Sequence, residues 1–197
     1  MEKIEEIKED LKNILSEERY IHSIGVMETA KRLAEIYNIS EEKASLAGLT
    51  HDIAKEMKPE EYLSYVKEHS IEIDEVERNN PKLLHGKVGA DIVKNKYNLD
   101  KQIQDAIKYH TTTNKDMDML AKIVYVADKI EPNRKSEAYD IETERKMAKE
   151  SINKTIIYII NEYIKSLIEK EKLIHPNAIE TRNKLILEEK RQEENKN

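Results

Sequence analysis

The chain places four of its six histidines, and two aspartates, in its least polar stretches: His22, His51, Asp52, His85, His110 and Asp128. This is unusual because 38% of the residues are charged. A carboxylate in a buried segment is costly unless it is paired or binds a metal ion. Imidazole and carboxylate groups without sulfur suit iron, manganese, zinc or nickel, and argue against a structural zinc site. The six residues therefore predict a metal site.

The alternative interpretation is a set of unrelated core residues. A single buried histidine is more often hydrogen-bonded to a backbone carbonyl, and an isolated His-Asp pair carries little information. Here, however, each of the six stands at the end of an apolar helical face, so several helices could point them at one place. His51 and Asp52 would lie about 100° apart on a helix, so that the short Asp52 carboxylate could bridge two metal ions.

The spacing of apolar residues is helical throughout and predicts an all-α fold. Low numbers of Gly and Pro, four each, agree with this prediction. Helices are expected over 3–15, 22–37, 41–55, 59–68, from 82 onward, 100–111, 117–130, 143–170 and after 175. Residues 69–82 are expected to be irregular, with a turn at Asn79–Pro81, and residues 133–142 to form a loop. We expect one domain over residues 1–187 and a charged C-terminal tail over residues 188–197.

Composition excludes several classes of function. The net charge of −6 and pI of about 5.7 argue against non-specific binding to nucleic acid. No apolar run is long enough to span a membrane, and no signal peptide is visible, so a cytoplasmic protein is expected. The chain has no cysteine and thus no thiolate nucleophile. The Ile-rich face of 152–168 could belong to the core or to a subunit interface, which leaves a homodimer open.

The order of the six residues resembles that of the HD-domain metal-dependent phosphohydrolases. Five local sequences are similar to the YqeK branch, which comprises bacterial symmetrical bis(5'-nucleosyl)-tetraphosphatases: RYIHSIGV (19–26), HDIAK (51–55), LHGKVGA (84–90), YHTT (109–112) and VYVADKIEPNR (124–134). The resemblance covers roughly residues 10–187 and implies a helical array of the HD-domain type. One departure is visible, because Thr113 and Asn114 stand where the branch usually has a glycine.

The resemblance implies a centre of two iron ions, with manganese or other divalent metals as alternatives. One ion would be held by His22, His51, Asp52 and Asp128, and the other would share Asp52 and bind His85 and His110. Two such ions can activate a water molecule and hold both sides of an in-line displacement. The implied reaction is symmetrical hydrolysis of a dinucleoside tetraphosphate, such as diadenosine tetraphosphate, to two nucleoside diphosphates. The expected partner is thus a small nucleotide.

Several residues near the predicted ligands could contact the phosphates. Lys55 lies three residues after Asp52 and is expected to assist catalysis and to bind substrate, although a solvated lysine at a helix end is the alternative. Lys129 and Arg134 could bind phosphate or form surface ion pairs. Thr111 and Thr112 could donate hydroxyl groups to phosphate or cap a helix. Glu131 matches the family pattern, but the sequence does not indicate its role.

Two other functions stay open at this stage. The chain could be an HD nucleotidase that acts on other nucleotides. It could also be a regulator that binds a nucleotide in the same pocket with slow turnover or none. Loss of ligands would favour the regulator, whereas all six are present in this sequence.

Overall fold

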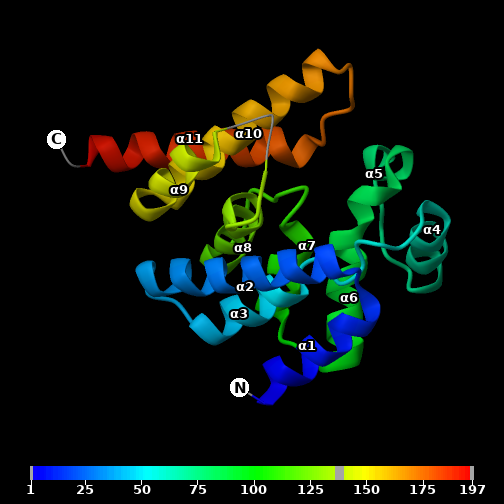
Figure 1. Ribbon diagram of the computed structural model, residues 1–197. Helices are drawn as coiled ribbons and strands as arrows, with labels where there is room; N and C mark the ends of the chain where they lie inside the picture. The colour runs from blue at the N-terminus through cyan, green and yellow to red at the C-terminus, as the bar shows by residue number, and fades with distance from the viewer. Residues whose placement is uncertain (1, 136–139, 196–197) are drawn as a thin grey trace.

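The computed structural model describes residues 2–135 and 140–195, and in these ranges every regular element is a helix (Figure 1). The elements are α1 (Glu2–Ile14), α2 (Glu17–Ile36), α3 (Glu41–Thr50), α4 (Pro59–Glu68), α5 (Glu75–Asn79), η1 (Pro81–Leu84, a 3-10 helix), α6 (His85–Tyr97), α7 (Lys101–Tyr109), α8 (Met119–Ile130), α9 (Ile141–Glu150), α10 (Ile152–Glu169) and α11 (Pro176–Glu194). None of them is long and apolar enough to cross a membrane.

Side-chain caps fix where the central helices begin. The hydroxyl of Ser16 accepts a hydrogen bond from the backbone of the third residue of α2, and Ser40 does the same for α3. Asp118 caps α8 in the same way. Because such caps satisfy donors that have no partner inside the helix, they set the register of three of the helices that border the candidate site. α2 consequently begins at Glu17 rather than at residue 22.

Small residues let the central helices approach one another closely. α2 and α3 approach closely at Gly48, where an added Cβ atom would lie 3.0 Å from the Cα atom of Met27. α6 and α7 are closer still, since a Cβ atom added at Gly86 would lie 2.8 Å from the carbonyl oxygen of Lys108. Only glycine tolerates this approach, which brings the start of α6 next to the end of α7.

The helix predicted over 41–55 is shorter than expected. α3 ends at Thr50, and residues 51–56 form successive turns with bonds such as Lys55 N–H to Asp52 C=O at 2.9 Å. His51 keeps helical dihedral angles (φ −55°, ψ −35°). The predicted angle between the side chains of His51 and Asp52 is therefore kept, although the regular helix ends before these residues.

The structure corrects several further predictions, most of them in the C-terminal half. The single helix expected over 143–170 is two helices, because Ser151 is extended (φ −152°, ψ 112°) and its hydroxyl caps α10. The stretch 69–82 is not irregular throughout, since it holds α5 and the start of η1. Residues 141–142 belong to α9, whereas 136–139 of the predicted loop lie outside the described residues. α11 continues to Glu194, so most of the predicted tail is helical.

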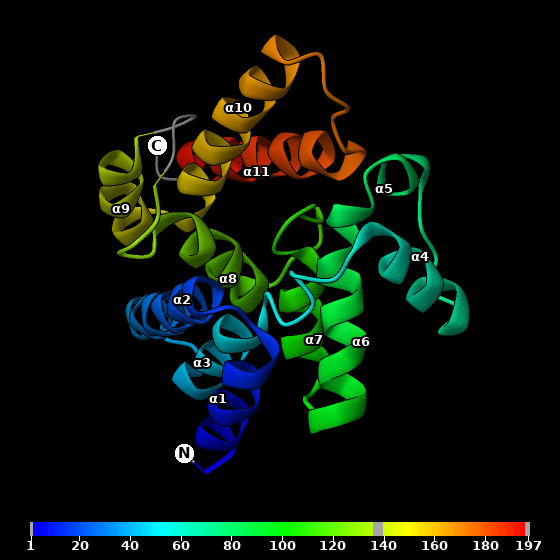
Figure 2. The ribbon, with the colours of Figure 1, turned by 45° about the vertical axis from the view of Figure 1, so that its right-hand side comes forward.

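The C-terminal helices form a separate layer. α9, α10 and α11 lie together on one side of the molecule, next to α8, while α1, α2, α3, α6 and α7 lie on the other side of α8 (Figure 2). The beginning of α11 faces α5, where the imidazole of His175 lies 2.8 Å from the Asp74 carboxylate. This contact joins the C-terminal layer to the part of the chain between α4 and α6.

Candidate metal centre

The six predicted ligands lie together in the interior, at the meeting point of five segments. His22 comes from α2, and His51 and Asp52 come from the turns after α3. His85 is the first residue of α6, His110 directly follows α7, and Asp128 lies in the last turns of α8. All six are buried. In the sequence, these residues were identified by the apolar helical faces on which they lie. In the structure, those faces pack into the core, and the six polar side chains consequently lie close together.

The two carboxylate oxygens of Asp52 face two different pairs of histidines. Oδ2 lies 3.4 Å from His51 Nε2 and 3.8 Å from His22 Nε2. Oδ1 lies 3.3 Å from His85 Nε2 and 3.4 Å from His110 Nε2. A carboxylate with this arrangement can serve two cations at once, one for each oxygen.

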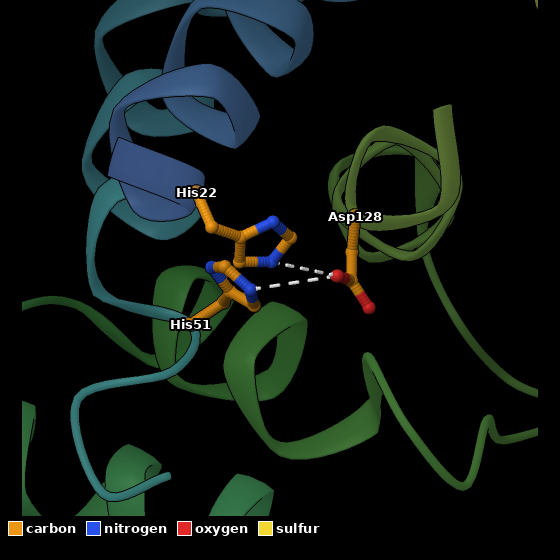
Figure 3. Close-up of side chains that lie close together, drawn as sticks. All are labelled: His22, His51 and Asp128. Atoms are coloured by element: carbon orange, nitrogen blue, oxygen red, sulfur yellow. Dashed lines mark hydrogen bonds and ion pairs between the residues drawn. The ribbon is translucent and has the colours of Figure 1, made fainter. Parts of the chain in front are cut away.

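Asp128 completes one of the two groups of donors. Its Oδ1 lies 3.0 Å from His22 Nε2 and 3.7 Å from His51 Nε2. Figure 3 shows the two imidazole rings and this carboxylate directed toward one another from α2, from the turn after α3 and from α8. These three residues, and His51 with Asp52 and His110, form two overlapping sets whose donor atoms are close enough to share an ion.

Hydrogen bonds fix the tautomer of the imidazole rings. The Nδ1 atoms of His51, His85 and His110 each lie 2.6–2.7 Å from the carbonyl oxygen three residues earlier in the chain. A carbonyl can only accept, so each Nδ1 carries the proton and donates it. The Nε2 atoms of the neutral rings are left with their lone pairs directed into the cluster, which is how metal-binding histidines are held.

The chemistry of this donor set fits a divalent cation. His51 Nε2 and Asp52 Oδ1 are buried without a hydrogen-bond partner among the described residues. The Nε2 atoms of His85 and His110 face each other at 2.9 Å. Lone pairs and carboxylates that face one another across so short a distance need protons or cations between them. Nitrogen and oxygen donors of this kind suit the divalent transition metals.

Without a metal ion, a proton must supply part of the missing charge. Burial acts to lower the pKa of His51, but Asp52 and Asp128 outweigh it and raise the pKa to about 9. Burial lowers the pKa of His110 to about 3. Asp52 acts to raise this pKa, whereas His85 and His51 lower it further. Desolvation acts to raise the pKa of the buried Asp52, but the positive charge of His51 outweighs it and holds this pKa well below its usual range. Metal binding would displace the proton from His51.

Glu131 has a role that the sequence did not reveal. Its Oε1 accepts a hydrogen bond from His22 Nδ1 at 3.1 Å, and its Oε2 accepts one from the backbone N–H of Asn133 at 2.7 Å. A Cβ atom at Gly25 would lie 2.5 Å from Oε2, so Gly25 makes the room that this carboxylate occupies. Glu131 thus holds the fourth histidine in the same tautomer as the other three.

Four cationic side chains surround the cluster. Arg19, which the sequence did not single out, donates from Nη1 to Asp52 Oδ2 at 2.9 Å. Lys55 Nζ lies 3.4 Å from Asp52 Oδ1 and 3.0 Å from His85 Nε2. Lys129 pairs with Asp128, and Arg134 Nη1 lies 3.7 Å from Asp128 Oδ1. The only signal for Arg19 in the sequence was its place three residues before His22.

The threonines after His110 form one wall of the site. Thr111 Oγ1 lies 2.9 Å from His85 Nε2, and Thr112 is buried beside it. Thr113 has a φ of 60°, in the left-handed region that β-branched residues rarely adopt. This is where the resemblance led us to expect glycine. Asn177 holds the strained residue in place by donating from Nδ2 to the Thr113 carbonyl oxygen at 3.0 Å.

Comparisons with known proteins agree with the fold and with the cluster. The HD domain family model matches residues 19–133, which include all six predicted ligands. A relative from Halalkalibacterium halodurans named bis(5'-nucleosyl)-tetraphosphatase, symmetrical, is 38% identical over 89% of this chain and 93% of its own length. A relative of the same name from Bacillus subtilis is 37% identical over 89% of this chain and 94% of its own length.

A solved structure supports the same conclusion. A protein from Clostridium acetobutylicum, described as a predicted HD superfamily hydrolase involved in NAD metabolism, has a TM-score of 0.90 and 40% identity, and the match covers 93% of this chain and 97% of that chain. The prediction of an all-α HD-domain fold is confirmed, as is the resemblance that the local sequences carried. The chain belongs to the HD domain family, in the group formed by its symmetrical bis(5'-nucleosyl)-tetraphosphatase relatives.

Proposed function

We propose that this protein hydrolyses dinucleoside tetraphosphates such as diadenosine tetraphosphate symmetrically, to two nucleoside diphosphates. The observation that carries the proposal is the Asp52 carboxylate, whose oxygens face one pair of histidines each. The names of the relatives support the same reaction. Intact ligands also favour turnover over a purely regulatory role.

His22, His51, Asp52 and Asp128 would hold one divalent cation, and Asp52, His85 and His110 would hold the other. When bound, two such cations activate a water molecule and neutralise charge on the phosphate that it attacks. We propose iron as the metal, as the resemblance to the HD-domain phosphohydrolases implies, and imidazole and carboxylate donors without sulfur suit it. Manganese and other divalent ions fit the same donors.

The cationic side chains would position the tetraphosphate. Arg19 lies beside Asp52 Oδ2, and Lys55 lies beside Oδ1, so positive charge stands on both sides of the bridging carboxylate. Arg134 and Lys129 add charge next to Asp128. Phosphates on either side of the reacting phosphorus would thus find partners. Attack at an inner phosphorus breaks its bond to the bridging oxygen between the two inner phosphates, and this oxygen leaves with the second nucleoside diphosphate.

The test is the product pattern from diadenosine tetraphosphate in ¹⁸O-labelled water, with ferrous or manganese ion added. The proposal requires ADP as the only nucleotide product, two for each substrate, with the label in one of the two molecules. AMP and ATP would mean cleavage between an outer and an inner phosphate and would refute symmetrical cleavage. Tight nucleotide binding without turnover in fully metal-loaded protein would instead indicate a regulator.

A further inference from the structure

Two cavities of similar size adjoin the candidate metal centre. The first, which we call the α2 cavity, has about 620 Å³ and is lined by residues that include Arg19, His22 and Arg134. The second, the α10 cavity, has about 600 Å³ and is lined by residues that include Asn80, Thr111, Tyr163, Ser166 and His175. The two cavities share no lining residue.

The two cavities reach the cluster through residues that lie near different oxygens of Asp52. His22 lines the α2 cavity, and its Nε2 faces Asp52 Oδ2 at 3.8 Å. Thr111 lines the α10 cavity and lies 2.9 Å from His85 Nε2, which faces Asp52 Oδ1 at 3.3 Å. A chain of phosphates laid across Asp52 would therefore have one end directed at each cavity.

We propose that the α10 cavity binds one nucleoside of a dinucleoside polyphosphate, while the other half of the substrate lies in the α2 cavity. This inference rests on the proposed function and adds where the two ends of the substrate are held. Symmetrical cleavage needs both inner phosphates at the metal centre, and two end sites flanking Asp52 would keep the substrate in that register.

The lining of the α10 cavity suits a nucleoside. Its volume lies in the range of small-molecule sites. The ring of Tyr163 lines it and is 45% exposed, so an aromatic face is available for stacking on a base. Ile160 and Leu167 add apolar surface beside this ring, and Asn80 and Ser166 supply polar groups.

The outer wall of this cavity comes from outside the HD domain match, which ends at residue 133. α10 and the segment that leads to His175 supply it, and the beginning of α11 lies against α5 (Figure 2). The contact between the His175 imidazole and the Asp74 carboxylate closes the wall on that side. The HD core thus carries the candidate metal ligands, and the C-terminal layer completes the site for the second nucleoside.

His175, Asp74 and Glu77 also lie close enough to suggest another metal site. The hydrogen bonds argue against it. His175 Nδ1 accepts from the backbone N–H of Asn177 at 3.2 Å, so the ring proton is on Nε2, which faces Asp74. Glu77 is occupied by Lys87. The cluster is a structural tie at the rim of the α10 cavity.

The test compares two substrates that have the same four phosphates. Diadenosine tetraphosphate has two nucleosides, so it must use both cavities. Adenosine 5'-tetraphosphate has one nucleoside, and this substrate can bind in the orientation that places its nucleoside in the α2 cavity. We expect Tyr163→Ala to raise KM for the dinucleoside about tenfold, the size of one lost stacking contact, with kcat and metal content unchanged. KM for adenosine tetraphosphate should change far less. Ser166→Phe, which fills the cavity, should act in the same way.

Tyr158→Ala is the matched control, because Tyr158 lies on the same helix outside the cavity. It should leave KM for both substrates unchanged. Equal changes for the two substrates in Tyr163→Ala, or an unchanged KM for the dinucleoside in both cavity variants, would overturn the cavity assignment alone. Failure of the metal-loaded wild-type protein to release ADP from diadenosine tetraphosphate would overturn the proposed function, and this inference with it.

Discussion

Asp52 is the residue on which the candidate centre depends most, because its two oxygens face both groups of histidines. His51 faces only one oxygen of Asp52, at 3.4 Å. The wild type is expected to bind about two metal ions for each chain. We expect Asp52→Ala to bind almost none. His51→Ala should retain more. Elemental analysis of protein purified without oxygen measures this difference.

The control for this prediction is His69→Ala. His69 pairs with Asp91, away from the cluster, and should keep the metal content of the wild type. An Asp52→Ala protein that is folded and carries its full metal content would show that this carboxylate does not bridge two ions.

Glu131 acts on the centre through His22, and its effect should be smaller than that of a ligand. In Glu131→Gln, one of the two acceptor oxygens becomes an NH₂ group, which is a donor and cannot accept the hydrogen bond that this oxygen received. We expect metal affinity to fall about tenfold, the lower end for groups that orient a metal-binding histidine. Competition with a chelating dye measures this affinity. The control is Glu28→Gln, on the exposed face of α2. An unchanged affinity in Glu131→Gln would leave Glu131 with a packing role only.

Among the elements, helical periodicity predicted most of the structure, because the apolar faces of α2, α6, α7 and α8 are long and regular. Periodicity could not show where a helix ends when no proline or glycine marks its end. Ser151 breaks α9 from α10 inside a continuous amphipathic pattern, and α3 ends at Thr50 although the pattern runs on. The six clustered side chains were found because they interrupt apolar faces. Arg19 and the role of Glu131 depend on contacts between distant segments, which no local pattern contains.

The turn after α7 offers a prediction about backbone strain. A β-branched residue at a φ of 60° costs about 1–2 kcal/mol. Thr113→Gly relieves this strain at a cost of about 0.5–1 kcal/mol in chain entropy. Thr113→Val keeps the strain, and both variants lose the hydroxyl that donates to the Thr112 carbonyl oxygen. We expect the glycine variant to exceed the valine variant in unfolding free energy by up to about 1.5 kcal/mol, measured by urea denaturation. The reverse order would mean that the turn adapts to the side chain.

At the scale of the whole molecule, the candidate centre joins five segments that are far apart in the chain, so metal binding should stabilise the fold. Saturation at a hundred times the dissociation constant contributes about 2.7 kcal/mol for each site. For a chain of this size, each kcal/mol corresponds to about 2–4 °C in Tm. Because two sites are emptied, we expect a chelator to lower Tm by roughly 10–20 °C and added metal to restore it. Asp52→Ala should not respond to the chelator, and an equal response there would point to an unrelated site.

Glu144 should control how global stability depends on pH. It is fully buried in α9, and neither carboxylate oxygen has a hydrogen-bond partner among the described residues. Burial raises the pKa of Glu144 from 4.5 to about 8, with Lys129 acting in the opposite direction. The folded state therefore holds a proton that the unfolded state releases above pH 4.5. Its contribution to stability is complete below that pH, and it is lost progressively up to about pH 8.

Glu144→Gln removes this proton while nearly preserving the shape of the side chain. We expect the variant to gain stability relative to the wild type as the pH rises from 5 to 8.5, because only the wild type must keep a carboxyl group protonated. Thermal unfolding of the metal-loaded wild type and of metal-loaded Glu144→Gln across this pH range gives the difference between their Tm values. Groups that titrate in the same way in both proteins do not contribute to this difference. Glu142→Gln, at an exposed position on the same helix, should follow the wild-type curve. A difference in Tm between Glu144→Gln and the wild type that stays constant from pH 5 to 8.5 would contradict the assignment, since a carboxyl group ionised throughout contributes no slope.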